Sequence, residues 1–299
     1  MEGYLHQNYA LSFSDFSTPR VLPRCGGWIL ERETPKLPYQ DAMGCYPLFL
    51  CRDWANLGSD VEGLSDDLVS LALVTDPFGE YTNNDLMRCF DKVVRYKEHF
   101  VTDLEDPSSR VATGKHRRNI ATALRQIELE ICPRPGDYLN EWVDLYSHLV
   151  CRHNISGLLS FSRYCFEKQL SLPGLVMFRA ANKGRTVGLH LWVVTGNVAY
   201  GHLGATNEMG YKLMASYALY WFALETFRGS IRWLDIGASP GGAHPTDQGL
   251  ARFKRGWATG TRPVYFCARI FDQEKYHLLV TAANIGQTDY FPAYRAGEF

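Results

Sequence analysis

The sequence predicts a mixed α/β (α+β) chain built as two lobes, each a mixed, mostly antiparallel sheet flanked by helices. Strand-like and helix-like runs alternate along the 299 residues. In the second half, hairpin-type turns at 182–184 and 196–197 separate three strand-like runs, which is typical of an antiparallel meander. A polar, proline-containing segment at 106–109 precedes a strongly basic run and resembles a hinge. We therefore expect one lobe over residues 1–112 and a second over 113–299.

In the first lobe, apolar runs and turn signals predict both strands and helices. Strands are expected at 28–30 and 45–50, followed by a helix at 64–73. A further strand at 74–78 runs into a proline turn. Asn84 then has the side chain to cap a helix that continues to about residue 96.

The second lobe alternates helices with strands in an order that hydrophobic periodicity and turn signals set. The order is helix, strand, two helices, three strands, helix, strand, short basic helix and strand. The elements with clear limits lie at 115–125, 127–131, 137–153, 161–170, 175–180, 186–194, 198–203, 211–227, 231–236 and 264–270.

The composition favours a globular protein with a large core, since 46% of the residues are hydrophobic and 13% are aromatic. The 31 basic residues nearly balance the 32 acidic ones, so any basic binding site must be local. The longest apolar run, at 213–224, is much shorter than the roughly 20 residues that span a bilayer. The amino terminus lacks the features of a secretion signal. We expect a cytoplasmic protein with no membrane span.

None of the eight cysteines forms a Cys-x-x-Cys pair, which argues against zinc ribbons and thioredoxin-like redox sites. We expect most of them to be reduced thiols in the core. His148, Cys151 and His153 fall close together on an expected helix, but no carboxylates or thiolates elsewhere complete a metal site. The sequence predicts no metal and no permanently bound cofactor.

Three stretches of the second lobe resemble one known family. The first is the basic run KHRRNI at 115–120. The second combines YGHLGA at 200–205, the helix around 217–221 and WLDIG at 233–237. The third and strongest, GLARFKRGW at 249–257, is similar to a Gly-Leu-x-x-Phe-Lys-x-Gly-aromatic signature. Together they resemble the Fem-like branch of the GNAT superfamily, a group of aminoacyltransferases and acyltransferases.

This resemblance implies a central sheet that splays open to admit a donor. It also implies transfer of an activated acyl or aminoacyl group to an amine, with aminoacyl-tRNA or acyl-CoA as the co-substrate. The acceptor would be a small-molecule amine, such as a peptidoglycan precursor or a natural-product amine. The sequence chooses neither the donor nor the acceptor, and it leaves the oligomeric state open.

Acyl transfer to an amine forms a tetrahedral oxyanion, which needs a positive charge or a hydrogen-bond donor beside it. The resemblance places Lys254, next to Phe253 in the signature, in that role; the alternative is a solvated surface lysine. Asp235 ends an apolar strand, where a carboxylate either orients the amine and accepts its proton or only caps the next loop. Tyr217, on the long helix, is a third catalytic candidate: it either reaches a thiol or ribose leaving group or only packs in the core.

Ordinary GNAT enzymes bind the coenzyme A pyrophosphate on backbone N–H groups of an Arg/Gln-x-x-Gly-x-Gly/Ala loop at a helix start. The corresponding residues here are the candidates for binding the donor: Asn207, Gly210, Tyr211 and Lys212. Gly210 fits the pattern, whereas Asn207 and Lys212 replace its first and last positions and Glu208 would repel phosphate. The incomplete pattern favours aminoacyl-tRNA, the donor of the Fem-like branch.

Basic and aromatic residues of the two basic segments are the candidates for contacting substrate: Lys115, Arg118, Arg252, Phe253 and Trp257. The basic side chains would bind phosphates of RNA or of a phosphorylated acceptor, or else form only a solvated face.

Two other functions stay open. The run LDIGASPGG at 234–242 resembles the first motif of S-adenosylmethionine-dependent methyltransferases, but fewer than 60 residues follow it, too few to complete a doubly wound domain. A GNAT-like protein that binds donors without catalysis is the other. A serine hydrolase is excluded, because Pro240 follows Ser239 and has no N–H for an oxyanion hole.

Overall fold

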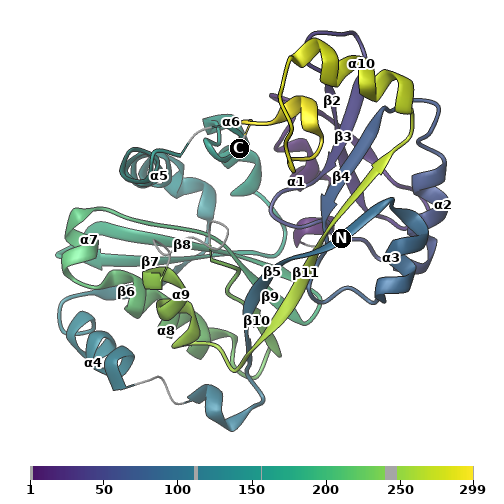
Figure 1. The fold of residues 1–299 in the computed structure, drawn as a ribbon. Coiled ribbons are helices and arrows are strands. Elements are labelled where there is room, and N and C mark those ends of the chain that lie inside the picture. Colours follow the sequence, from purple (N-terminus) through teal and green to yellow (C-terminus); the bar gives the residue numbers. More distant parts are fainter. Residues whose placement is uncertain (1–2, 111–113, 156, 240–247, 299) are drawn as a thin grey trace. The chain divides into compact units, whose positions relative to one another are not determined.

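The chain folds into two compact units, and neither is a continuous stretch of sequence. The computed structural model describes residues 3–110, 114–155, 157–239 and 248–298 (Figure 1). The segments divide as follows: unit 1 comprises 1–4, 97–156 and 166–262, and unit 2 comprises 5–96, 157–165 and 263–299.

The expected single boundary at 112 lies outside the described residues. The chain divides elsewhere because two strands each begin in one unit and end in the other. These strands are β5 (Lys92–Asp103) and β11 (Gly260–Ile270).

Unit 1 contains a mostly antiparallel sheet, and only the pair β9–β10 is parallel. Its strands follow the spatial order β5, β10 (Trp233–Asp235), β9 (Val198–Thr206), β8 (Arg185–Thr195), β7 (Leu175–Asn182) and β6 (Glu128–Cys132). Lys183 and Gly184 join β7 to β8, and both have the positive φ angles, 51° and 76°, that suit a tight hairpin. The predicted meander is therefore confirmed.

The core of unit 1 lies between this sheet and α8 (Ala215–Phe227). Because α8 is apolar on most sides, it packs on β7, β8 and β9 and also against α4 (Gly114–Ala123). The opposite face of the sheet is covered by α5 (Leu139–His153) (Figure 1). On the α8 side, α9 (Gln248–Arg255) joins the same hydrophobic core through Phe253.

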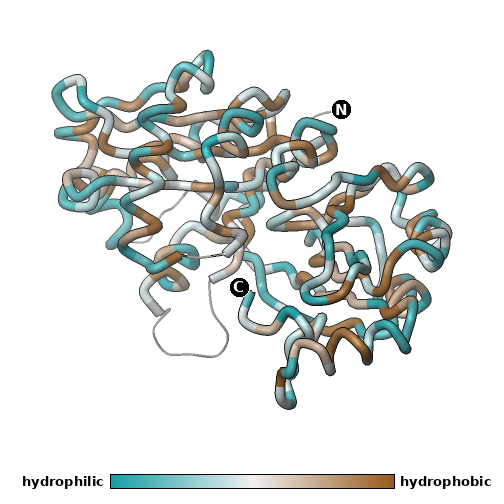
Figure 2. The backbone as a smooth tube through the Cα atoms, turned by 90° about the horizontal axis from the view of Figure 1, so that it is seen from above, coloured by the Kyte–Doolittle hydropathy of each residue, from teal (hydrophilic) through white to brown (hydrophobic). Residues whose placement is uncertain are grey.

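The strands of unit 2 also pair in a mixed way, antiparallel except for the pair β3–β4. Its strands follow the order β1 (Thr18–Val21), β2 (Trp28–Glu33), β3 (Gln40–Gly44), β4 (Ser70–Val74) and β11. Its helices are α1 (Gln7–Leu11), α2 (Leu57–Glu62), α3 (Asn83–Cys89) and α10 (Gln273–Ala283). Hydrophobic and hydrophilic stretches alternate along the chain, as expected for elements with one buried face (Figure 2). The predicted fold class is confirmed for both units.

Short 3-10 helices complete the described structure, at Gly3–Leu5, Trp54–Asn56, Pro107–Arg110, Pro135–Tyr138, Gly157–Leu159 and Ala293–Arg295.

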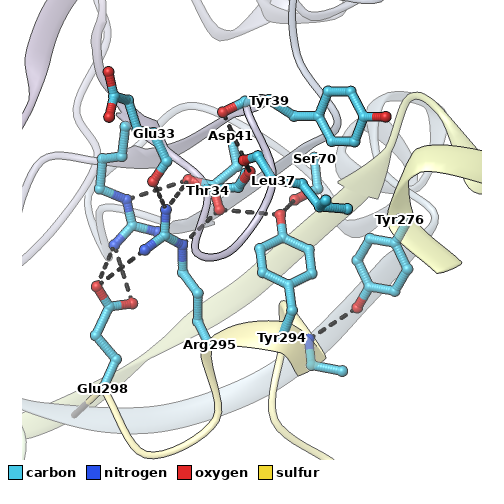
Figure 3. Close-up of polar contacts among 12 residues, drawn as sticks. Glu33, Thr34, Leu37, Tyr39, Asp41, Ser70, Tyr276, Tyr294, Arg295 and Glu298 are labelled. Carbon is cyan, nitrogen blue, oxygen red and sulfur yellow. Dashed lines mark hydrogen bonds and ion pairs between the residues drawn. The ribbon is translucent and has the colours of Figure 1, made fainter. Parts of the chain in front are cut away.

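A buried ionic cluster fixes the segment after α10 to β2 and β3 of unit 2 (Figure 3). Asp41 is fully buried and accepts hydrogen bonds from Arg295 Nε at 2.6 Å and from the Tyr294 hydroxyl at 3.0 Å. Arg32 Nε lies 3.3 Å from the Asp41 carboxylate. Glu298 in turn lies 3.2 Å from Arg32 and 3.3 Å from Arg295. The two guanidinium groups therefore balance two carboxylates.

Several predictions for the first lobe are wrong. The strand at 28–30 is confirmed within β2, but 45–50 forms no regular strand and contributes only a bridge from Phe49 to Thr75. The helix predicted at 64–73 is absent from this described segment, because α2 ends at Glu62 and β4 occupies the apolar run at 70–74. Short apolar runs suit a buried strand and a buried helix equally well, so periodicity alone does not separate them.

The other errors in the first lobe concern where its helices and strands begin and end. Of the strand predicted at 74–78, only Val74 lies in a regular strand, because it is the last residue of β4. The helix predicted from Asn84 to residue 96 is α3, which is capped by Thr82 and ends at Cys89. The remaining residues begin β5, which the sequence analysis missed, as it also missed β1 and α10.

In the second lobe the predicted elements are confirmed with shifted ends. The helix predicted at 161–170 is α6 (Arg163–Gln169). The long helix predicted at 211–227 is two helices, α7 (Glu208–Lys212) and α8, because Met214 has a left-handed φ of 59°.

All eight cysteines are free thiols, and all except Cys151 are buried, as predicted. Burial raises the pKa of Cys45 to about 12, so its thiol stays protonated. Among the described helices, none is long and apolar enough to cross a membrane. In the described part of the chain, no three His, Cys, Asp or Glu side chains form a group that could hold a metal.

Candidate active site

The sheet of unit 1 opens between β9 and β10. The parallel register pairs Leu234 with Ala199 and ends with Asp235 opposite Tyr200. After Asp235 the backbone follows β5 instead: Ile236 N–H donates to the Phe100 carbonyl at 3.0 Å. Because β9 continues to Thr206, the two strands separate beyond Asp235. The end of the β9–β10 pairing at Asp235 agrees with the splayed sheet that the family resemblance implied.

Lys254 reaches this opening from α9. Its Nζ donates a hydrogen bond of 2.6 Å to the carbonyl of Ala238, three residues beyond the end of β10. Burial lowers the pKa of Lys254 to about 8, although the Asp235 carboxylate raises it, and Lys97 lowers it further. The side chain is thus a cation largely withdrawn from water. Gly237 leaves room for this contact, since a Cβ there would lie 3.2 Å from Nζ, and its positive φ of 74° also suits glycine.

Asp235 is buried at the same opening and has two donors. His99 Nδ1, on β5, lies 2.8 Å from Oδ2 and 3.0 Å from Oδ1. The N–H of Gly237 donates to Oδ1 at 2.7 Å. Asp235 therefore caps the loop after β10, as one hypothesis held, and also holds an imidazole ring.

His99 was missed by the sequence analysis. It lies on β5, which was not predicted, and only the pairing of β5 with β10 brings it to Asp235. No local motif marks such a contact between residues 136 positions apart.

An aromatic cluster surrounds the base of Lys254. The ring of Phe253 packs on Tyr217 at 4.9 Å and on Tyr220 at 5.0 Å between centroids. The ring of His116, from α4, lies 4.8 Å from that of Trp257 and its Nε2 is 3.0 Å from the Phe253 carbonyl. These contacts fix α9 against α8 and α4, and therefore set the direction of Lys254.

A second histidine approaches the cluster from β8. His190 is buried, and its ring centroid lies 4.6 Å from that of Tyr220. Burial, with a smaller effect of the Lys254 charge, lowers the pKa of His190 to about 3. This ring is therefore neutral at physiological pH.

Two buried hydrogen-bond donors near Lys254 are unused. Ser239 Oγ and Trp257 Nε1 have no hydrogen-bond partner within the described parts of the chain. Ser239 follows the carbonyl that Lys254 binds, and Trp257 lies three residues after Lys254. Unused donors beside a cation suit a site where a ligand oxygen acquires negative charge.

The structure brings some of the predicted site residues together and separates others. Lys254, Asp235, Tyr217, Phe253 and Trp257 belong to the region around the sheet opening. The other predicted substrate-contacting residues are exposed on the outer faces of α4 and α9: Lys115, Arg118 and Arg252.

The predicted donor-binding residues lie around α7. Asn207 Oδ1 already accepts a hydrogen bond of 2.9 Å from Gly210 N–H. Gly210 packs so tightly on β8 that a Cβ would lie 2.2 Å from the Val187 carbonyl oxygen. Tyr211 and Lys212 are exposed, and the Arg152 guanidinium lies 3.9 Å from the Tyr211 ring centroid. Two of the four residues thus have structural roles.

An open pocket of about 300 Å³ adjoins Asn207 on the α5 side of the sheet. It carries charges of both signs, contributed by Glu141, Asp144, Arg179 and Arg185. Arg179 pairs with Glu130 at 2.7 Å, so its charge is already compensated. This pocket is separate from the Lys254 region, whose helices α8 and α9 do not line it.

No protein-family model matches the sequence, and no curated protein matches it either. Solved structures do match over most of the chain. FemX is 13% identical with a TM-score of 0.65, covering 91% of this chain and 93% of FemX.

Two further structures are similar. The C-terminal (DUF2156) domain of a protein assigned as a lysylphosphatidylglycerol synthetase from Agrobacterium fabrum is 14% identical, with a TM-score of 0.66 and coverage of 95% and 92%. L-PGS from Bacillus licheniformis is 12% identical, with a TM-score of 0.60 and coverage of 96% and 99%. At such identities the likeness shows a shared fold. The chain thus shares its fold with FemX, as the Fem-like resemblance of the sequence implied.

The interpretation of 234–242 as a methyltransferase motif loses its structural basis. That motif opens a doubly wound parallel sheet, whereas β10 lies in a mostly antiparallel one, with β5 antiparallel on one side. Residues 240–242 of the motif lie outside the described residues.

Proposed function

We propose that this protein is an acyltransferase that moves an activated acyl or aminoacyl group onto an amine. One observation carries the proposal: a largely desolvated lysine ammonium reaches the point where β9 and β10 separate, beside a buried carboxylate. A cation held there stabilises negative charge far better than a solvated lysine, because the surroundings are less polar than water.

The reaction follows from this arrangement. The amine nitrogen attacks the carbonyl carbon of the donor, and the carbonyl oxygen becomes an oxyanion. Lys254 stabilises this oxyanion, and Asp235 helps to orient the attacking amine. The new C–N bond remains, while the C–O bond of an aminoacyl ester or the C–S bond of a thioester breaks.

Aminoacyl-tRNA is the donor that the arrangement favours. Lys115, Arg118 and Arg252 are exposed on α4 and α9, whose inner sides hold Lys254 in place. A phosphate backbone lying on these helices would be close to the opening. The Gly210 N–H, which a coenzyme A pyrophosphate would use, is already bonded to Asn207. Acyl-CoA is the second candidate.

The first experiment measures thermal unfolding with aminoacyl-tRNA, coenzyme A and S-adenosylmethionine added separately. A rise in Tm with charged tRNA, followed by transfer of the labelled amino acid to an amine, supports the proposal. Stabilisation by S-adenosylmethionine alone would overturn it. Stabilisation by a donor with no product from any amine would identify a binding protein without catalysis.

The second experiment locates the RNA. The double variant Arg118→Ala, Arg252→Ala is expected to bind tRNA more weakly and with a shallower dependence on salt, because fewer counterions are released. Arg88→Ala is the control, since Arg88 is also exposed but lies on α3 of unit 2. Equal salt dependence in both variants would remove α4 and α9 from the RNA-binding surface.

A further inference from the structure

The carboxylate of Asp235 is already occupied, so a different group must receive the proton of the amine. Its Oδ1 accepts from Gly237 N–H at 2.7 Å, and His99 Nδ1 lies within 3.0 Å of both oxygens. One of these partners is an imidazole, which has a second nitrogen.

The contact with Asp235 fixes the state of the His99 ring. A carboxylate beside Nδ1 keeps the proton on that nitrogen, so Nε2 carries a lone pair and can accept a proton. In the described part of the chain, no hydrogen bond joins His99 Nε2 to another residue. The His99 side chain is 10% exposed, so the ring is not sealed from a ligand.

His99 and Lys254 converge on the same few residues at the end of β10. The His99 ring binds Asp235, and the Lys254 ammonium binds the Ala238 carbonyl. Between them, Gly237 bonds to Phe100, the neighbour of His99 on β5. An imidazole and a cation thus bind the two ends of the four-residue stretch from Asp235 to Ala238.

We propose that His99 is the general base of the transfer reaction and that Asp235 is its positioning residue. The inference rests on the proposed function and names the group that handles the proton. An amine that arrives as an ammonium ion first loses its extra proton to His99 Nε2, which passes it to solvent. As the C–N bond then forms, a further proton moves from the amine nitrogen to His99 Nε2. As the C–O or C–S bond of the donor breaks, the same proton moves to the leaving oxygen or sulfur, and His99 returns to its starting state.

A buried His–Asp pair can also serve only to hold two strands together, so the test must separate chemistry from stability. Acceptor basicity does this. An alkylamine, with a pKa near the ~10.4 of lysine, arrives protonated at neutral pH, whereas hydroxylamine arrives neutral. A base is therefore needed far more for the alkylamine, and a purely structural role of His99 would affect both acceptors equally.

The experiment measures transfer from aminoacyl-tRNA, or from acyl-CoA if that is the active donor, to butylamine and to hydroxylamine. His99→Gln is expected to lower kcat with butylamine by about 10²- to 10⁴-fold and with hydroxylamine much less. In His99→Ala, added imidazole is expected to restore part of the butylamine reaction. His202→Gln is the control, because His202 is buried to a similar extent in the same unit.

The outcomes are distinguishable. If the wild-type protein transfers to neither amine from either donor, the proposed function fails, and the role of His99 fails with it. If the wild type is active and His99→Gln slows both acceptors equally, or neither, the proposed function stands and His99 is not the base. A failure of imidazole to restore His99→Ala, with that variant folded, would also count against the base.

Discussion

The ring of His116 lies so close to Gly256 that a Cβ atom on residue 256 would be 2.2 Å from its Cε1 and 2.4 Å from its Nε2. His116 comes from α4, and Gly256 directly follows α9. The same ring packs on Phe253 and Trp257. Gly256, the second glycine of the GLARFKRGW signature, therefore allows α4 to hold α9, and with it Lys254, in place.

Gly256→Ala is expected to lower both stability and activity. The methyl group would collide with a buried ring, so α9 must shift, and such overpacking typically costs about 1–3 kcal/mol. Urea unfolding and the transfer assay measure the two effects. Gly249→Ala, on α9 itself, is the control: nothing lies within 4 Å of its added Cβ, and alanine favours a helix by roughly 1 kcal/mol. If both variants behave alike, the contact with His116 does not set the position of α9.

Lys254→Met is expected to reduce kcat by about 10²- to 10³-fold, because the oxyanion loses its cation. Donor affinity should change much less. The Tm should stay the same or rise, since burial, which lowers the pKa of Lys254 to about 8, makes the charge costly to the fold. Lys92→Met, at an exposed position, is the matched control. A folded Lys254→Met protein with full activity would remove this residue from the mechanism.

Stability is expected to fall in mild acid. Burial lowers the pKa of both His190 and His202 to about 3, below the ordinary value of 6.5. Between these values the unfolded chain binds protons that the folded chain does not. The free energy of unfolding is therefore highest above pH 6.5 and falls towards pH 3 by about 1.4 kcal/mol per pH unit for each histidine.

His202→Gln isolates this effect from the carboxylates that titrate in the same range. His202 lies 3.0 Å from the Tyr4 hydroxyl and 3.0 Å from Gln169 Oε1, contacts that a glutamine side chain can partly replace. Urea unfolding at several pH values gives the slope of the unfolding free energy against pH. In the variant this slope should be smaller by about 1.4 kcal/mol per pH unit, the contribution of one histidine. Identical slopes would mean that His202 is not kept neutral by the fold.

Arg295→Met is expected to destabilise unit 2 by about 3–5 kcal/mol, because it leaves the buried Asp41 carboxylate with less compensating charge. Arg134→Ala removes an ion pair of similar length, 2.8 Å to Asp137, from an exposed site and should cost at most about 1 kcal/mol. Chemical denaturation of both variants measures the two losses of unfolding free energy. Equal losses would show that burial of the cluster adds nothing.

The sequence was most informative where local patterns decide the structure. The turn at Lys183–Gly184 and the alternation in β7, β8 and β9 were sufficient to predict the meander of unit 1. The motif around Lys254 located a residue that the structure places at the sheet opening. In both cases neighbouring residues carry the whole signal.

The sequence was least informative where distant segments meet. Strand β5 is exposed on many of its residues and has little hydrophobic periodicity, so its pairing with β10 was not predictable. The contact between His99 and Asp235 depends on that pairing. The roles of Asn207 and Gly210 were also hidden, because only tertiary packing shows that one caps α7 and the other meets β8.

The discontinuous units also bear on how the protein emerges from the ribosome. Unit 1 has all of its residues once 262 has been synthesised, whereas unit 2 needs 263–299 to supply most of β11 and the partners of Asp41. Domains begin to fold as soon as their chain is available, so unit 2, which holds residues 5–96, is the later unit to be completed. Until then, residues 5–96 lack the segment 263–299 that completes unit 2, so their apolar surface is exposed to chaperones and to misfolding.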